Sequence, residues 1–348
     1  MKPEFDICSC ENCLTDYSRI LISVKLRLEN SLATAFLTFS HFVMAMIDHV
    51  ANIIAKLGAL RPAPKRMLVQ VPAGLKTRAT ELIEALEKHG YSAILAADEC
   101  FGACDLPLAA AEASGADAVL HIGHVPFYKP IKSDVPVAYY EWPIDVEIDE
   151  TKIKREINNI TEKKIGLVSS VQYLHLLPKI AEIIKAVGKD AIVGGHLLGC
   201  WTKNAEQIAS KSDALLFVGS GMFHPCGFEC DYFFDLERGE IRDVRNEIAK
   251  WEKIKWGRIA AARNAITFGI LVSTKPGQLD MERAEMIKQA LEKRDKKAFI
   301  LVMDRITDAT LLGLDVDAFI NTACPRLMDD KWSKPFVNAA DVEKLFNE

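Results

Sequence analysis

The stretch Asp117–Ile122 reads DAVLHI, and its Asp-Ala opening returns at Asp213–Val218 (DALLFV) and at Asp317–Ile320 (DAFI). The three Asp-Ala openings lie 96 and 104 residues apart. Each begins a short, nearly continuous apolar run, which is typical of a strand buried on both faces of a parallel sheet. Recurrence at such an interval predicts three related structural units in one chain.

The same order of elements precedes each opening. An apolar strand leads into an amphipathic helix at Arg66–Val71 and Arg78–Lys88, at Lys164–Ser169 and Leu176–Ala186, and at Thr267–Ser273 and Met281–Lys293. A second strand follows each helix, at Ser92–Ala96, Asp190–Val193 and Ala298–Val302. Alternating strands and helices predict an α/β fold, with three similar parallel-sheet domains around a pseudo-threefold axis.

The expected domains are residues 47–146, 147–255 and 256–348. Their boundaries fall in an acidic loop at Trp142–Glu150 and in a helical stretch at Ala249–Ile259, which we expect to pack between units. Residues 1–46 form an N-terminal extension, either helical or disordered. Its apolar part, Ser31–Ile47, is too short and too polar for a spanning helix. Met44 and Met46 also offer a start site just before the first amphipathic helix.

Composition narrows the class of protein. The chain of 348 residues is 49% hydrophobic and 26% charged, and its net charge is −5. It therefore has no surplus of Lys and Arg that could neutralise the phosphates of a nucleic acid. We also expect the protein to be cytoplasmic and not to bind a membrane. Nine cysteines, an odd count at irregular spacing, do not indicate a disulfide framework. Metal-binding thiolates are the better interpretation.

Two cysteines occupy the same position in the repeat. Cys104 lies 13 residues before Asp117, and Cys200 lies 13 residues before Asp213. The third unit has Asp304 there, and its cysteine, Cys324, follows the third strand. Both kinds of loop lie at the carboxyl ends of parallel strands, where such sheets bind ligands. Three converging thiolates suit a 4Fe–4S cluster with one iron left open, and zinc is the rival metal.

Other cysteines form incomplete sets. Cys100 and Cys104 match the first half of the Cys-x3-Cys-x2-Cys motif of common radical enzymes, but Pro107 stands where the third cysteine belongs. Further groups lie at Cys226 and Cys230, beside His224, and at Cys8, Cys10 and Cys13. None of these groups supplies four ligands, so their roles stay open.

The motifs that carry a family resemblance are Val71-Pro-Ala-Gly-Leu75, Phe101-Gly-Ala-Cys-Asp-Leu106, Leu198-Gly-Cys200, Gly219-Ser-Gly-Met-Phe-His-Pro225 and Asn321-Thr-Ala-Cys-Pro-Arg-Leu327. In their order and spacing they resemble the archaeal diphthamide synthase family, the 2-(3-amino-3-carboxypropyl)histidine synthases. The resemblance covers about residues 47–348. It implies one 4Fe–4S cluster per chain, held by Cys104, Cys200 and Cys324 in a homodimer.

The resemblance also implies a reaction. A 3-amino-3-carboxypropyl group passes from S-adenosylmethionine to C2 of a histidine of translation elongation factor 2 by a radical route, the first step of diphthamide biosynthesis. An external electron donor reduces the cluster, and no side chain is assigned a catalytic role. The candidates for S-adenosylmethionine contacts are Gly74, Gln172, Ser220, Gly221, His224 and Arg326.

Two alternatives stay open from the sequence. A quinolinate synthase shares the three-domain, three-cysteine architecture but condenses small molecules. An electron-relay subunit would hold a cluster without catalysing a reaction. Release of methylthioadenosine distinguishes the first alternative, and modification of elongation factor 2 by the chain alone distinguishes the second.

Overall fold

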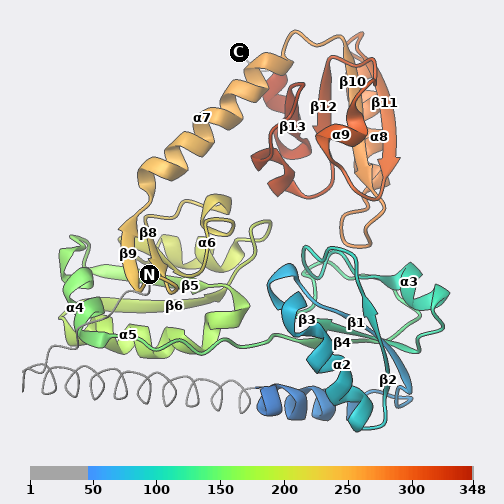
Figure 1. The fold of residues 1–348 in the computed structure, drawn as a ribbon. Coiled ribbons are helices and arrows are strands. Elements are labelled where there is room, and N and C mark those ends of the chain that lie inside the picture. Colours follow the sequence, from blue (N-terminus) through green and yellow to red (C-terminus); the bar gives the residue numbers. More distant parts are fainter. Residues whose placement is uncertain (1–45, 347–348) are drawn as a thin grey trace, which may run out of the picture. The chain divides into compact units, whose positions relative to one another are not determined.

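The computed structural model describes residues 46–346 (Figure 1). The chain divides into two compact units, residues 1–58 and residues 59–348. In the first unit, residues 46–58 are helical, and the rest of the predicted N-terminal extension lies outside the described residues. Among the described residues, no helix is both long enough and apolar enough to cross a membrane.

The second unit contains three sheets. The first has the order β2-β1-β3-β4 and consists of β1 (Arg66–Gln70), β2 (Ser92–Ala96), β3 (Ala118–Ile122) and β4 (Val137–Tyr140). The second has the order β6-β5-β7-β8-β9 and consists of β5 (Lys164–Ser169), β6 (Asp190–His196), β7 (Ala214–Gly219), β8 (Tyr232–Asp235) and β9 (Glu240–Asp243). The third has the order β11-β10-β12-β13 and consists of β10 (Thr267–Ser273), β11 (Lys297–Met303), β12 (Ala318–Asn321) and β13 (Phe336–Asn338).

The three sheets share one topology. In each, the first strand lies between the second and the third, and a fourth strand pairs with the third. All of these pairings are parallel, and β9 adds an antiparallel edge to the second sheet. The prediction of three similar α/β domains is therefore confirmed.

Helices follow the strands in a regular order. The α-helices are α2 (Ala79–Lys88), α3 (Leu108–Ala113), α4 (Glu150–Asn159), α5 (Leu177–Ala186), α6 (Lys203–Ala209), α7 (Arg245–Ala262), α8 (Met281–Glu292) and α9 (Asp308–Leu311). The 3-10 helices are η1 (Ala73–Arg78), η2 (Val171–Leu176), η3 (Pro225–Gly227), η4 (Pro325–Asp329) and η5 (Ala339–Leu345). The helix after each first strand buries one apolar stripe, as with Ile180, Ile183 and Ile184 of α5.

The repeated aspartates have a structural reason. The carboxylate of Asp117 accepts hydrogen bonds from the backbone N–H groups of Lys65 and Arg66, at 2.9 and 3.1 Å. Asp213 accepts one from Lys164 at 2.9 Å. Asp317 accepts two, from Ile266 and Thr267, at 2.9 and 2.8 Å. Each aspartate thus fixes the start of the first strand against the start of the third.

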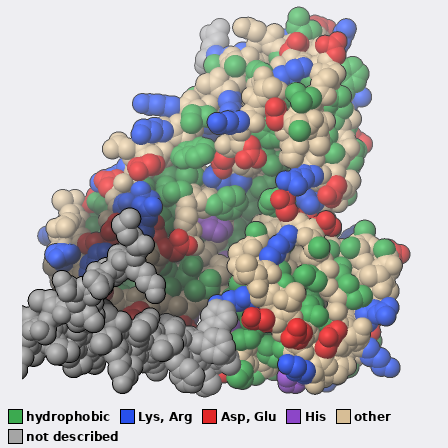
Figure 2. Space-filling view, viewed as in Figure 1, with side chains coloured by type: hydrophobic (Ala, Val, Ile, Leu, Met, Phe, Trp, Pro, Cys, Tyr) green, Lys and Arg blue, Asp and Glu red, His purple; other side chains and the backbone are tan. Residues whose placement is uncertain are grey.

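Each sheet has its own apolar core, and α7 connects the second sheet to the third. Ile259 and Ala262, at the end of α7, belong to the core of the third sheet together with Phe268 and Ile270. The predicted boundary at residue 255 lies inside this helix, and the domain boundaries stay predictions. Acidic and basic side chains are interspersed over the face shown in Figure 2, in keeping with the small net charge.

Candidate metal centre and its pocket

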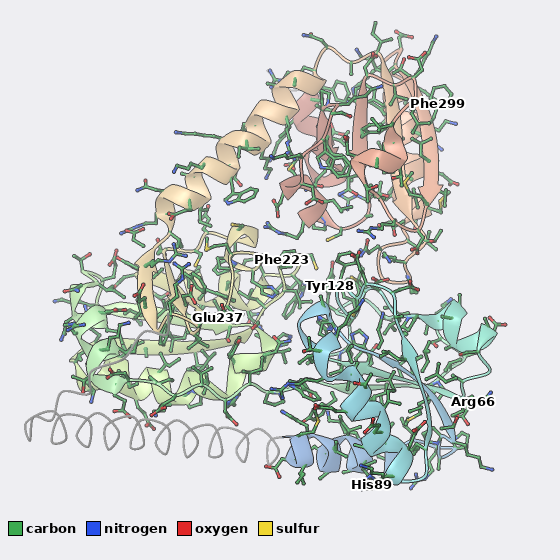
Figure 3. The ribbon with its side chains drawn as sticks, viewed as in Figure 1. Arg66, His89, Tyr128, Phe223, Glu237 and Phe299 are labelled. Carbon is green, nitrogen blue, oxygen red and sulfur yellow. The ribbon has the colours of Figure 1, made fainter. Side chains whose placement is uncertain are left out.

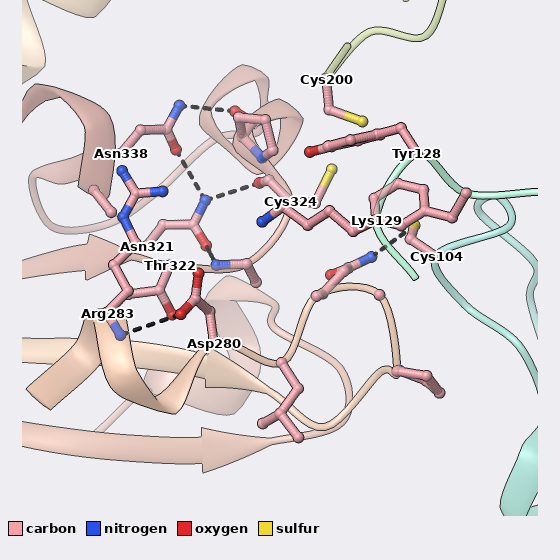
Figure 4. A pocket seen from close by; sticks show the side chains of 18 of the residues that line it. Cys104, Tyr128, Lys129, Cys200, Asp280, Arg283, Asn321, Thr322, Cys324 and Asn338 are labelled. Atoms are coloured by element: carbon pink, nitrogen blue, oxygen red, sulfur yellow. Dashed lines mark hydrogen bonds between the residues drawn. The ribbon is translucent and has the colours of Figure 1, made fainter. Parts of the chain in front are cut away.

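Cys104, Cys200 and Cys324 line a single pocket of about 300 Å³, called here the thiol pocket. Cys104 follows β2, Cys200 follows β6 and Cys324 follows β12, so each of the three sheets contributes one thiol. The three thiols surround the side chain of Tyr128 (Figure 4). The other polar side chains that line the pocket are Tyr128, Lys129, Gln278, Asp280, Arg283, Asn321, Thr322 and Asn338.

The loop that carries Cys104 is held by the loop after β10. Gly277 N–H donates to the Cys104 carbonyl at 2.8 Å, and Gln278 Nε2 donates to Cys104 Sγ at 3.3 Å. A Cβ at position 277 would lie 2.6 Å from the Cys104 Cα, so the close approach requires glycine. The third repeat, through the loop after β10, therefore contacts the first repeat at Cys104.

The loop that carries Cys324 is fixed by Asn321, which is 2% exposed. Its Nδ2 donates to the Cys324 carbonyl at 2.8 Å and to Asn338 Oδ1 at 2.9 Å, while its Oδ1 accepts from Ala323 N–H at 3.0 Å. The loop around Cys200 is closed by reciprocal backbone hydrogen bonds between Leu198 and Trp201, at 2.9 and 3.1 Å. Hydrogen bonds therefore fix the backbone of both loops next to the cysteine.

Burial raises the pKa of all three thiols. The pKa of Cys200 rises to about 12 and that of Cys324 to about 11, chiefly through burial, and the pKa of Cys104 rises for the same reason. The other thiolates raise the pKa of Cys200 further, so the sulfurs lie close enough to repel one another. Thiolates in this pocket therefore need a cationic partner, which is what an iron–sulfur or zinc centre provides.

Tyr128 was missed by the sequence reasoning. It stacks on Trp201 with ring centroids 6.3 Å apart, and Figure 3 labels it at the end of the first repeat that carries the thiol pocket. Burial raises the pKa of Tyr128, and the three cysteine charges raise it further. An aromatic ring therefore forms part of the pocket that the three thiols share.

The six candidate S-adenosylmethionine contacts are not among the residues that line the thiol pocket. Gln172 Nε2 donates to the Gly123 carbonyl, Ser220 Oγ lies 3.5 Å from the Tyr173 hydroxyl, and the buried His224 Nδ1 has no hydrogen-bond partner among the described residues. Gly221 has a φ of +68°, and Gly74 lies in η1 with open space beside its Cα.

Arg326 is already engaged by protein groups. Its Nη1 donates to the Cys226 carbonyl at 2.9 Å, and its Nη2 pairs with Asp329. The guanidinium also lies over the ring of Phe223, 5.2 Å from the centroid. This residue joins η4 of the third repeat to the loop after β7 in the second.

A second metal-capable group lies outside the thiol pocket. Cys100, His121 and His124 place one ligand atom each within 4.8 Å of the others. Burial lowers the pKa of His121 to about 3 and that of His124 to about 4, so both are neutral at pH 7. The sequence reasoning considered Cys100 only with Cys104; the His-x2-His spacing at the end of a strand is the signal that it missed.

The fold and the thiol pocket define a class of protein, in which three similar α/β domains each direct one cysteine to a shared centre. The sequence profile of the diphthamide synthesis protein family matches residues 71–348. The chain belongs to this family.

Named relatives agree with that assignment. The chain is 31% identical to the 2-(3-amino-3-carboxypropyl)histidine synthase of Pyrococcus horikoshii, over 82% of this chain and 86% of that protein. It is 28% identical to the synthase of Methanocaldococcus jannaschii, over 85% and 88%. The human synthase subunit 1 is 26% identical over 78% of this chain and 65% of its own length.

Solved structures show the same likeness. Dph2 from Pyrococcus horikoshii superposes with a TM-score of 0.76 at 29% identity, covering 86% of this chain and 91% of that one. A second structure of that protein, which contains a 4Fe–4S cluster, gives a TM-score of 0.75 at 30% identity, covering 85% and 90%.

Proposed function

We propose that this chain is a 2-(3-amino-3-carboxypropyl)histidine synthase. It transfers the 3-amino-3-carboxypropyl group of S-adenosylmethionine to C2 of a histidine of translation elongation factor 2, and methylthioadenosine is released. The single observation that carries the proposal is the placement of three thiols, one from each repeat, in one pocket.

Cys104, Cys200 and Cys324 hold one 4Fe–4S cluster in this proposal. The donor set fits the group, since three half-buried thiols with raised pKa values face one cavity and no fourth cysteine lines it among the described residues. When bound, the cluster supplies the electron that cleaves the bond between the sulfur and the methionine γ-carbon of S-adenosylmethionine. With three cysteine ligands, one iron of the cluster would be left for that substrate to bind.

The chain's own residues position and shield the reacting groups. Gln278 stabilises the Cys104 thiolate by donating a hydrogen bond to its sulfur. Tyr128, which lies among the thiols and stacks on Trp201, offers an aromatic surface to the substrate. Lys129 and Arg283 bring positive charge to the pocket wall, where a substrate carboxylate can pair with it. Orientation of the substrate relative to the cysteines then selects which S–C bond breaks.

The earlier candidates complete the proposed substrate site. Gln172 lies in η2, which follows β5, and Ser220, Gly221 and His224 lie in the loop after β7. Gly74 lies in the matching 3-10 helix of the first repeat, η1, and Arg326 follows Cys324. We assign these six residues to contacts with the nucleoside and amino-acid portions of S-adenosylmethionine. A homodimer, an external electron donor and a cytoplasmic location are also part of the proposal.

The test uses the full chain with its cluster reconstituted anaerobically, together with dithionite, S-adenosylmethionine and elongation factor 2. The expected result is methylthioadenosine, and elongation factor 2 heavier by one 3-amino-3-carboxypropyl group. A factor whose target histidine is replaced by glutamine is the matched control and should gain no mass.

Failure of this reaction with an intact cluster and a strong reductant would contradict the proposal. Methylthioadenosine without a mass change would instead mean that cleavage occurs but that the protein substrate is a different one. A quinolinate synthase would give neither product.

A further inference from the structure

Three potential metal ligands, none of which lines the thiol pocket, converge at the carboxyl end of the first sheet. Cys100 lies in the loop after β2, His121 lies in β3, and His124 follows β3. Cys100 is 7% exposed and His121 is fully buried. His121 Nε2 and His124 Nδ1 are 3.0 Å apart, close to the separation of two nitrogens on one tetrahedral metal ion.

Gln70 fixes which nitrogen of His121 is available. Gln70 Nε2 donates to the Asp105 carbonyl at 2.7 Å, so its Oε1 is the atom that faces His121 Nδ1, also at 2.7 Å. His121 must therefore donate from Nδ1, and the lone pair of Nε2 points toward His124. A hydrogen bond from the second ring nitrogen is the usual support of a metal-binding histidine.

The turn that places His124 depends on Gly123. This residue has a φ of +87°, a conformation that favours glycine, and a Cβ there would lie 2.9 Å from Pro72 Cγ. Gly123 N–H is held by the Tyr140 carbonyl at 2.7 Å. The chain therefore folds back immediately after β3 and brings His124 onto His121.

We propose that Cys100, His121 and His124 bind one divalent ion of the zinc class. A thiolate with two imidazoles is a donor set that zinc favours, and calcium or magnesium would require oxygen ligands instead. Water completes the coordination. Binding converts the Cys100 thiol to a thiolate with release of one proton, and the Nδ1 proton of His124 moves to Nε2. The ion is not oxidised or reduced.

Zinc content of the full chain tests the proposal directly. The protein with its cluster reconstituted is incubated with zinc sulfate and desalted, and iron and zinc are measured together. We expect about one zinc per chain in the wild type. Cys100→Ala should lose the zinc and keep the iron. The matched control Cys230→Ala removes another buried thiol, which faces the Tyr232 carbonyl, and should keep both metals.

Cobalt(II) identifies the ligands in a chain that cannot hold the cluster. In a Cys104→Ala/Cys200→Ala/Cys324→Ala background, cobalt should give a thiolate charge-transfer band and intense tetrahedral bands. Adding Cys100→Ala should abolish the charge-transfer band, and adding His124→Ala should weaken cobalt binding. Adding Gln70→Leu should weaken binding by about 10- to 100-fold while keeping the band, as expected for a residue that orients a ligand.

A charge-transfer band that is missing from the background, or that is unchanged by Cys100→Ala, would overturn the proposal. Far-ultraviolet circular dichroism shows whether each variant is folded, and His124→Ala, at the least buried of the three positions, gives a second test if Cys100→Ala unfolds. Because the cobalt experiment uses a chain without the cluster cysteines, its outcome does not depend on the proposed enzymatic function.

Discussion

The first and third repeats use the same two loop positions for different chemistry. After the second strand, the first repeat has Cys104 and the third has Asp304. Seven residues after the Asp-Ala aspartate, the first repeat has His124 and the third has Cys324. The backbone pattern is common to both repeats, whereas the loop that carries the thiol is not. Strand order therefore fixes where a ligand can lie, and the packing of the repeats decides which loop supplies it.

The structure gives a reason for Asp304. Lys275 pairs with Asp105, next to Cys104, at 2.7 Å and with Asp304 at 3.5 Å. The side chains of Lys275 and Asp105 are 13% and 9% exposed, but that of Asp304 is 72% exposed. Position 304 thus lies at the outer side of a contact between the repeats, and a thiol there would not face the pocket.

Moving the third cysteine is the strongest way to break this comparison. Cys324→Ala should abolish methylthioadenosine release, and adding Asp304→Cys should not restore it, because residue 304 does not line the thiol pocket. The measurement is product formed under anaerobic reduction, with Cys226→Ala as the control that keeps activity. Recovery of activity in the double variant would mean that repeat register, and not loop packing, selects the ligand.

Removing the cation of the buried ion pair should give the next largest effect. Lys275→Met leaves Asp105 buried and unpaired, and one Asp105 oxygen already lacks a partner among the described residues. We expect a loss of about 3–5 kcal/mol in the free energy of unfolding, measured by urea denaturation. Lys288→Met breaks an exposed pair with Glu292 and should change it by less than about 1 kcal/mol.

The second repeat offers a pH test at His224. Burial lowers the pKa of His224 to about 4, from the usual 6.5. His224 is therefore harder to protonate in the folded protein than in the unfolded chain. This difference leaves the free energy of unfolding unchanged above pH 6.5 and lowers it as the pH falls from 6.5 toward 4. The loss amounts to about 3 kcal/mol at most, at about 1.4 kcal/mol per pH unit.

The variant that checks the pH test is His224→Phe, whose ring can pack beside Phe217 and Phe223 as the imidazole does. Its free energy of unfolding should fall less steeply between pH 6.5 and 4 than that of the wild type. Parallel curves for the two proteins would show that His224 does not titrate in this range.

The contact between the first and third repeats predicts a smaller effect at Gly277. Gly277→Ala places a Cβ 2.6 Å from the Cys104 Cα. We expect the free energy of unfolding to fall by about 1–3 kcal/mol and the iron content after reconstitution to be lower than in the wild type. Gly257→Ala, in α7 with no atom within 4 Å of the added Cβ, should instead stabilise the protein by about 0.5–1 kcal/mol. Equal effects at the two sites would exclude the steric explanation.

The smallest effect is expected at Asp304. Asp304→Asn removes an exposed charge 3.5 Å from Lys275. The free energy of unfolding should therefore change by about 0.5 kcal/mol or less, and the cluster content should be unchanged. Asp105→Asn, on the buried side of the same lysine, should lower the free energy of unfolding, measured by urea denaturation, by more than Asp304→Asn does. A larger effect at Asp304 would reverse the ranking of the two carboxylates.

Much of the fold was predictable because it follows from local patterns. The predicted strands Lys164–Ser169 and Thr267–Ser273 coincide with β5 and β10, and the predicted helices differ from α2, α5 and α8 by one residue at most. The Asp-Ala spacing identified the repeat, since each aspartate binds the backbone at the start of the first strand. The fourth strands were missed, because they are short and follow long loops.

The site was only partly predictable. The register of Cys104 and Cys200 pointed to a shared position, and the structure brings both thiols to the pocket of Cys324. Tyr128, Gln278 and Arg283 could not be found, because they reach the pocket only through packing of the first and third repeats. His121 and His124 carried a spacing signal, but their proximity to Cys100 depends on the tight turn at Gly123.

The central claim is that Cys104, Cys200 and Cys324 together hold one cluster. Iron and sulfide content, with electron paramagnetic resonance of the reduced protein, should be measured for the wild type and for the alanine variant at each of the three cysteines. We predict one 4Fe–4S cluster in the wild type, loss or severe depletion in all three variants, and a normal cluster in Cys100→Ala. A normal cluster in the Cys104, Cys200 or Cys324 variant would contradict the account.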